Sequence, residues 1–314
     1  MTIKRITGWL AGVAALMLLL TGCHPLVDDE EIPHQTVYAS FYPIYALSEM
    51  ILKDVPEMEL HQLVQPQDGC LRNYELSDWD LYQLAYNADA VIIGGRGLEQ
   101  FASSLESMGS SGSALVQLFQ NQTLDNNGET ASDEDASHLA DENPHLYLSV
   151  RALPEILEAL CAYMTALDPA FGDVYASNLV TALERVDALI AEYDDAMAHM
   201  DLSAPVALLN EALIYPANDL GLNVACRIDR ESATELAGTE WTDALSAMQA
   251  AGAQIALIEK QAPDALIRQL NAEGICAVQL DILSTGREDM GSDGYFEAMS
   301  GNLDALRKCF SKNK

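Results

Sequence analysis

The side chains best suited to chemistry in this sequence are its cysteines. One follows an apolar run near the N-terminus, and five lie beyond it: Cys70, Cys161, Cys226, Cys276 and Cys309. An odd number of cysteines argues against a full disulfide framework in an oxidising compartment, although one pair stays open. Cys161 and Cys309 fall in helical patterns and Cys276 in an apolar strand pattern, so we expect small buried thiols there. Cys70 differs because it lies in a polar, turn-like stretch.

Other motifs for catalysis are weak. No nucleophile and base stand at a spacing that strongly predicts nucleophilic catalysis. Gly94-Gly95-Arg96-Gly97 follows an apolar run, but it lacks the GxGxxG and GxxxxGK spacings of phosphate loops. It therefore predicts a tight turn between a strand and a helix. We expect that the chain is not an enzyme.

The charge of the chain is strongly negative. It has 48 acidic and 16 basic residues, a formal net charge of −32, which excludes nucleic acid and anionic membrane surfaces as partners. Seven of the acids lie in residues 121–143, a stretch without periodically spaced apolar residues that could face a core. This pattern predicts a solvated acidic loop. The alternative is that the loop gathers cations near a site.

Strands and helices are expected to alternate in two parts of the sequence. The first part predicts strands at 36–43, 59–64 and 90–93 and helices at 44–52, 78–87 and 97–108. The second predicts strands at 205–209, 223–228, 255–258 and 275–280 and helices at 211–220, 241–251, 263–273 and 295–310. Such alternation is typical of an α/β fold with parallel sheets, in which ligands bind at the C-terminal ends of the strands.

A long helical pattern separates the two parts. After a predicted helix at 153–167, residues 169–200 place apolar side chains three and four positions apart without an interrupting proline. Asp168 is expected to cap this helix and Pro169 to occupy its first turn. At 1.5 Å per residue it would extend about 45 Å.

The N-terminus is typical of a secretory signal. Lys4 and Arg5 precede an apolar run, residues 6–20, that is short for a membrane span. The run ends in Leu-Thr-Gly-Cys23, which resembles the lipobox of bacterial lipoproteins, where the cysteine is acylated and becomes the mature N-terminus. We therefore expect a lipoprotein signal peptide at 1–22 and an acidic tether at 23–35.

Several segments together resemble the metal-binding lipoproteins of ABC importers for zinc and manganese. They run in order from residue 36 to residue 310: ASFYPIYALSEMI, NYELSDWDLYQLAYNADAVIIGGRGLEQF, NPHLYLS, ALDPAFGDVYASNL, NEALIYPANDLGL and YFEAMSGNLDALRK. The resemblance implies two (β/α) lobes, residues 36–150 and 202–314. It also implies connecting helices at 151–201, with 169–200 as a long rigid helix, and a metal ion held between the lobes.

The resemblance also implies a ligand set, carried over residue by residue. His145 and Asp281 match two family ligands, and both side chains suit a metal ion. Arg72 and Asn210 stand where the family has its other ligands. An arginine has no lone pair to donate and asparagine is a weak donor, so Cys70 and Glu211 are the candidates to replace them. A thiolate in the set would favour zinc over manganese. Alternatively, Asp281 forms an ion pair with Arg72.

The function that the resemblance implies is capture and delivery of a divalent metal, zinc first and manganese second. The protein would be extracytoplasmic, anchored in the bacterial cell membrane through lipidated Cys23, monomeric, and would hand its cargo to an ABC permease driven by a separate ATPase. Two alternatives stay open: the same importer fold with a non-metal or chelated anionic ligand, and a surface interaction or adhesion lipoprotein.

Overall fold

Each half of the chain forms a four-stranded parallel sheet, which confirms the predicted α/β class with two lobes. The structure is a computed structural model that describes residues 35–65, 74–108, 113–123, 142–228, 230, 234–284, 286 and 288–310. The expected signal peptide with Cys23, nearly all of the expected tether, and the segment with Cys70 and Arg72 lie outside these residues. Gln35, expected at the end of the tether, is the first residue of the first strand.

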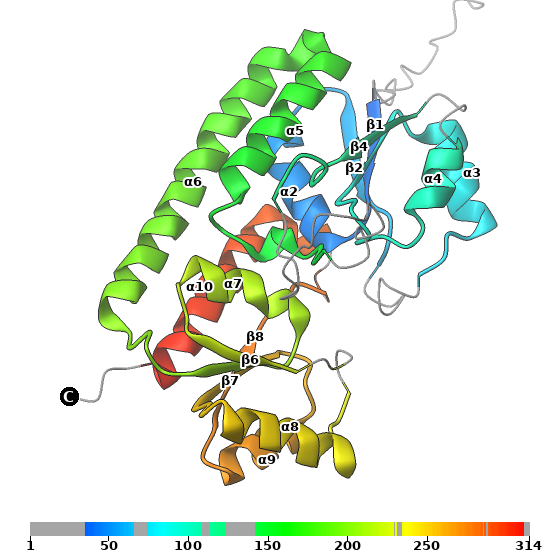
Figure 1. Ribbon diagram of the computed structural model, residues 1–314. Helices are drawn as coiled ribbons and strands as arrows, with labels where there is room; N and C mark the ends of the chain where they lie inside the picture. Colours follow the sequence, from blue (N-terminus) through cyan, green and yellow to red (C-terminus); the bar gives the residue numbers. More distant parts are fainter. Residues whose placement is uncertain are drawn as a thin grey trace, which may run out of the picture. The chain divides into compact units, whose positions relative to one another are not determined.

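The first sheet has the strand order β2-β1-β3-β4. Its strands are β1 (Gln35–Ala39), β2 (Met58–Gln62), β3 (Ala90–Ile93) and β4 (Ala114–Gln117). Its helices are α2 (Tyr42–Leu52), α3 (Asp78–Asn87) and α4 (Ala102–Met108). Figure 1 shows α3 and α4 on one side of this sheet and α2 on the other. The sequence did not predict β4, an edge strand that pairs only with β3.

The turn after β3 explains why the glycines at 94–97 are not a phosphate loop. Gly95, Arg96 and Gly97 all have positive φ angles, so the chain turns sharply as predicted. The buried Glu99 carboxylate accepts hydrogen bonds from the backbone N–H groups of Gly94 (2.8 Å) and Gly95 (2.9 Å). The N–H groups that could have bound an anion are therefore occupied by the chain's own carboxylate. The helix predicted from residue 97 begins only at Ala102.

The second sheet has the order β6-β5-β7-β8 and separates two hydrophobic cores. Alternate residues of its strands face opposite sides: Ile255 and Leu257 belong to one core, and Ala256 and Ile258 to the other. The strands are β5 (Val206–Leu208), β6 (Val224–Arg227), β7 (Ile255–Glu259) and β8 (Cys276–Leu280). The helices are α7 (Ile214–Asp219), α8 (Thr239–Ala250), α9 (Asp264–Ala272) and α10 (Gly291–Cys309).

The long helix is present, but it begins differently from the prediction. Helix α5 (Leu153–Leu167) is followed by a 3-10 turn, Pro169–Phe171, and then by α6 (Gly172–His199), whose 28 residues extend about 42 Å. Asp168 does not cap this helix with its side chain; its carboxylate accepts a hydrogen bond from the Tyr175 hydroxyl at 3.4 Å. Helix α6 packs against α2 of the first lobe and α10 of the second (Figure 1).

Two cysteines differ from the expected buried thiols. Cys276 at the start of β8 and Cys309 at the end of α10 form a disulfide, with their Cα atoms 6.1 Å apart. The sequence patterns placed both residues correctly but could not show that this strand and this helix pack together. Cys161, by contrast, is a buried free thiol in α5, as expected.

Candidate metal centre

His145 lies where the chain passes from the first lobe to the second, just before a 3-10 turn, η4 (Leu146–Leu148). The fully buried Asn143 fixes it, because the Asn143 Oδ1 accepts a hydrogen bond from the His145 backbone N–H at 3.2 Å. The same oxygen is 2.8 Å from the His145 Nδ1. An amide oxygen can only accept, so Nδ1 is the donor in this contact. In the neutral form of the ring, the lone pair is then on Nε2.

Asn143 also joins His145 to the second lobe. Its amide Nδ2 donates to the backbone carbonyl of Glu211 at 2.7 Å, and the Tyr215 hydroxyl donates to the Asn143 carbonyl. Glu211 begins a 3-10 turn, η6 (Glu211–Leu213), which follows β5 and leads into α7. Two of the predicted ligand segments are thus held together by one buried amide.

Asn210 has a structural role that the sequence did not predict. Its side chain is buried, and its Oδ1 caps η6 by accepting from the backbone N–H of Ala212 at 3.0 Å. Its Nδ2 donates to the carboxylate of Glu259 at 3.5 Å, and Glu259 forms a buried ion pair with Arg230. The capping contact uses the amide oxygen that would otherwise be offered to a metal ion.

Asp281 follows β8, at the C-terminal end of the strand. Its Oδ1 accepts from the backbone N–H of Leu283 at 2.8 Å, and its Oδ2 lies 3.1 Å from the ammonium nitrogen of Lys260. The side chain of Asn302 in α10 accepts a hydrogen bond from the Asp281 backbone N–H at 2.6 Å and donates one to the Asp281 carbonyl at 2.9 Å. The carboxylate is thus fixed in place and paired with a lysine that the sequence analysis did not consider.

The segments of His145 and Asp281 are also in contact. The Tyr147 hydroxyl donates to the carbonyl of Ile282 at 3.4 Å, and the Tyr295 hydroxyl donates to the carbonyl of Tyr147 at 2.7 Å. Among the residues that the structure describes, however, no three His, Cys, Asp or Glu side chains lie close enough together to hold a metal ion. Cys70 and Arg72 lie outside those residues, so the complete predicted ligand set stays a prediction.

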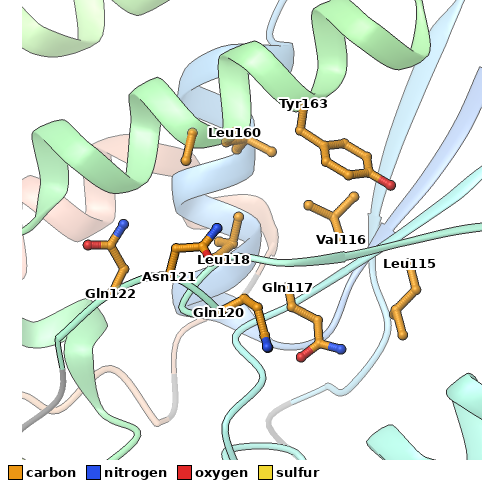
Figure 2. Close-up of a pocket in the computed structure, with 10 residues that line it drawn as sticks. Leu115, Val116, Gln117, Leu118, Gln120, Asn121, Gln122, Leu160 and Tyr163 are labelled. Atoms are coloured by element: carbon orange, nitrogen blue, oxygen red, sulfur yellow. The ribbon is translucent and has the colours of Figure 1, made fainter.

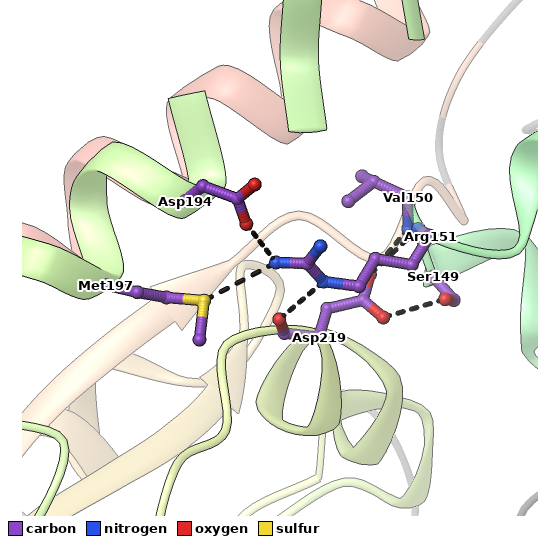
Figure 3. Close-up of polar contacts among 6 residues, drawn as sticks. All are labelled: Ser149, Val150, Arg151, Asp194, Met197 and Asp219. Atoms are coloured by element: carbon purple, nitrogen blue, oxygen red, sulfur yellow. Dashed lines mark hydrogen bonds and ion pairs between the residues drawn. The ribbon is translucent and has the colours of Figure 1, made fainter. Parts of the chain in front are cut away.

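A buried carboxylate fixes the chain on the far side of η4 (Figure 3). Asp219, at the end of α7, accepts hydrogen bonds from the Ser149 hydroxyl (2.8 Å) and from the backbone N–H groups of Val150 (2.6 Å) and Arg151 (3.3 Å). Arg151 in turn donates to Asp194 of α6 at 2.5 Å. Burial raises the pKa of the Asp219 carboxyl, against the lowering effect of these hydrogen bonds. The network joins α6 and α7 to the segment that carries His145.

A second connection ties the start of this segment to the first lobe. The Arg96 guanidinium in the turn after β3 pairs with Glu142, and its Nη1 donates to the Gln120 carbonyl at 3.3 Å. Glu142 immediately precedes Asn143. Both ends of the His145 segment are therefore anchored by ion pairs or buried hydrogen bonds.

A cavity of about 340 Å³ lies elsewhere, between β4 and α5 (Figure 2). Its lining includes Gln117, Gln120, Asn121, Gln122 and Tyr163, and the remaining lining residues are apolar. No lining residue is charged, and none is a cysteine or a histidine. The cavity therefore offers none of the usual ligands for zinc.

Asn143, Asp219 and Lys260 are the residues that the sequence analysis missed. Each acts through tertiary contacts, and a single asparagine, aspartate or lysine carries no spacing signal. Only Asn143 has a local feature, because it precedes a proline and is therefore biased toward extended backbone.

No helix of the described chain is long and apolar enough to cross a membrane.

Solved structures resemble this fold closely. The nickel complex of FpvC from Pseudomonas aeruginosa has a TM-score of 0.72 and 21% identity, covering 88% of this chain and 96% of that one. The zinc-bound ZnuA-like domain of AdcA from Streptococcus pneumoniae has a TM-score of 0.73 and 18% identity, covering 88% and 99%. A mutant of the laminin-binding adhesin Lmb from Streptococcus agalactiae has a TM-score of 0.71 and 19% identity, covering 88% and 100%.

Identities this low establish the fold alone. A comparison with curated proteins gave no significant match. The family model described as "Zinc-uptake complex component A periplasmic", ZnuA, matches residues 37–309, which is most of the chain. The chain therefore belongs to the ZnuA family of periplasmic solute-binding proteins, which are transport proteins and not enzymes.

Proposed function

We propose that this protein captures a divalent metal ion between its two lobes, zinc first and manganese second, and delivers it to an ABC permease powered by a separate ATPase. The observation that carries the proposal is the match to the zinc-uptake family over residues 37–309. The neighbours with bound nickel and zinc support a divalent cation as cargo. The hydrogen bond between the His145 Nδ1 and Asn143, which orients the ring, supports this residue as a ligand.

The ligand set that we propose is Cys70, His145, Glu211 and Asp281. Zinc accepts thiolate, imidazole and carboxylate ligands together, and the thiolate disfavours manganese. For Asp281 to bind, the cation must displace the ammonium group of Lys260 from one carboxylate oxygen. Lys260 is 65% exposed, so this displacement costs little. We also propose a lipid anchor at Cys23, a monomeric state and lobes at residues 36–150 and 202–314. These proposals rest on the sequence resemblances described above.

Metal content is the direct test. The protein is purified without chelator and its zinc, manganese and nickel are measured by elemental analysis and native mass spectrometry. We expect about one zinc ion per chain. A stoichiometric organic adduct in place of the metal would contradict the proposal.

Cys70→Ser tests the proposed thiolate ligand. If the thiolate binds zinc, its loss should weaken zinc binding at neutral pH by at least about 100-fold, measured by competition with a chromogenic chelator. Cys226→Ser is the matched control, because Cys226 is a free, partly buried thiol in the second lobe. Unchanged affinity in Cys70→Ser would remove Cys70 from the ligand set.

One observation favours a second candidate, the same fold with an anionic or chelated cargo. The amide oxygen of Asn210 is used as a helix cap, and Asp281 is paired with a lysine. If Arg72 also faces the site, as the resemblance implies, two cations and one amide would line it, which suits an anionic ligand better than a bare dication. The native mass spectrum distinguishes the two candidates.

A further inference from the structure

Helix α3 carries a row of three exposed aromatic side chains, Trp79, Tyr82 and Tyr86, which we call the α3 aromatic row. The spacing of three and four residues places them on one face of the helix, while Leu84 faces the core. They are 65%, 51% and 75% exposed. Among the described residues, the other exposed large hydrophobic side chains are scattered over α5, α6 and the 3-10 turn before α10: Tyr163, Val180 and Met290.

The three rings are already arranged as a surface for a partner. The ring centroids of Trp79 and Tyr82 are 5.7 Å apart with an interplanar angle of 16°, and those of Tyr82 and Tyr86 are 4.8 Å apart at 38°. Rings that stack on one another lose little further freedom when a partner binds. Contiguous exposed apolar side chains on a soluble lobe commonly mark an interaction surface.

The negative charge around the α3 aromatic row favours a cationic partner. Residues 74–95 contain four acidic residues and no lysine or arginine. Asp80 closes the capping box with Ser77, and Asp89 binds the backbone N–H of Thr36. Glu75, which precedes the helix, and Asp78, in its first turn, are both exposed. The surface therefore combines aromatic faces with negative charge, and both attract cations.

The protein shows elsewhere how such a surface holds a guanidinium group. The guanidinium carbon of Arg185 lies 4.0 Å from the centre of the Phe296 ring, and its Nη2 is 2.7 Å from the Asp293 carboxylate. An arginine is thus held between an aromatic face and a carboxylate on the surface of α6 and α10. A guanidinium stacks on rings more readily than an ammonium because it is planar and more weakly hydrated.

From these observations we propose that the α3 aromatic row binds an arginine-bearing segment of a partner protein. Guanidinium groups stack on the rings of Trp79, Tyr82 and Tyr86, while Glu75 and Asp78 supply the opposite charge. The surface belongs to α3 of the first lobe, and none of its residues is in the proposed metal site. The proposed interaction therefore uses none of the side chains that would bind the cargo.

The test uses the full chain and fluorescein-labelled hexa-arginine, with hexalysine and a neutral glycine-serine peptide as comparison probes. Binding is measured by fluorescence anisotropy at about 0.15 M salt, where distant surface charges are largely screened. The triple variant Trp79→Ala, Tyr82→Ala, Tyr86→Ala leaves the net charge unchanged. Tyr163→Ala is the matched control, because it removes an exposed tyrosine from α5. Circular dichroism and the midpoint of thermal unfolding confirm that the variants fold.

We expect the triple variant to bind hexa-arginine about tenfold more weakly than the unmodified protein, as the sum of modest cation–π contributions. Tyr163→Ala should leave the affinity for hexa-arginine unchanged. The triple variant should lose less affinity for hexalysine than for hexa-arginine. Equal binding of hexa-arginine to the triple variant and the unmodified protein, or no binding to either, overturns the proposal. An equal proportional loss for both cationic peptides also overturns it. Suppose that a neutral oligosaccharide such as chitohexaose binds the unmodified protein but not the triple variant, while both proteins bind hexa-arginine equally. The row would then be a carbohydrate-binding surface instead.

Discussion

His145 shows how one buried amide can prepare a metal ligand. Asn143 has no access to solvent, and its Oδ1 accepts hydrogen bonds from both the backbone and the ring of His145. The backbone donor identifies this atom as the oxygen, so the ring tautomer follows from the geometry. The same asparagine binds the carbonyl of Glu211. A single residue therefore sets the tautomer of one candidate ligand and its distance from the segment of another.

Lys260 is the residue whose change should most directly alter metal affinity. Its ammonium group lies 3.1 Å from the Asp281 carboxylate and competes with a cation for that oxygen. Because the pair is exposed on the lysine side, Lys260→Ala should change the free energy of unfolding by less than about 1 kcal/mol. The affinity for zinc, measured by chelator competition, should rise by about fivefold or less.

The control for this variant removes an equal charge elsewhere. Lys53 lies at the end of α2 and is exposed. Lys53→Ala should leave zinc affinity unchanged if the effect of Lys260 is local. An equal gain in both variants would show that only net charge matters, and a fall in affinity in Lys260→Ala would place Asp281 outside the ligand set.

At the scale of elements, Asp219 connects α7 to the segment that carries His145, and its stability contribution should depend on pH. Burial raises the pKa of its carboxyl in the folded protein above the usual value of an aspartate. The folded state therefore holds the proton more tightly than the unfolded state. As the pH rises from about 4 through the pKa of the folded state, the contribution of Asp219 to the free energy of unfolding falls. The slope is at most about 1.4 kcal/mol per pH unit.

Asp219→Asn checks the sign because asparagine does not titrate. The free energy of unfolding is measured by urea denaturation for both proteins at several pH values. The variant should be less stable overall, since its amide cannot accept all three hydrogen bonds that the carboxylate accepts. The stability advantage of the unmodified protein should shrink as pH rises through this window. An advantage that grows with pH would show that the hydrogen bonds outweigh burial.

The disulfide between β8 and α10 is the second element-scale contact that can be tested. It closes a loop with a sequence separation of 33 residues, next to the strand that leads to Asp281. Loss of the cross-link in Cys276→Ser, Cys309→Ser should lower the free energy of unfolding by about 3–4 kcal/mol, because the unfolded chain gains freedom. Urea denaturation measures this difference, with Cys226→Ser as the control. A loss of the same size in the control would assign the effect to serine substitution and not to the bond.

At the scale of the whole molecule, the net charge of −32 should accelerate the capture of cations. Deleting residues 123–139 removes five acids, all of which lie outside the described residues. We expect zinc affinity to change by less than about threefold and the association rate to fall at low salt, as measured by stopped-flow fluorescence. The difference in rate should vanish at high salt. A total loss of binding would show that the loop supplies ligands.

The sequence was a good guide to elements whose signal is local. The bounds of α3, β3 and α5 agree with the predicted helices at 78–87 and 153–167 and the predicted strand at 90–93. Periodicity and the capping box at Ser77 act within a few residues, so they are visible in the sequence. The prediction failed at β4 and at the start of α4, where pairing with β3 and the bonds of Glu99 decide the backbone.

The candidate site divides in the same way. The sequence by itself determined the α/β alternation and the long helix between the two parts, because these follow from residue type and chain order. The candidate ligands His145, Glu211 and Asp281 come from the resemblance to the metal-binding family and stay a prediction. Only the tertiary structure decided that Cys276 pairs with Cys309, that Asn143 binds the Glu211 carbonyl, and that Lys260 pairs with Asp281. These contacts join residues far apart in the chain, and their energies depend on distances that arise only when the lobes are folded.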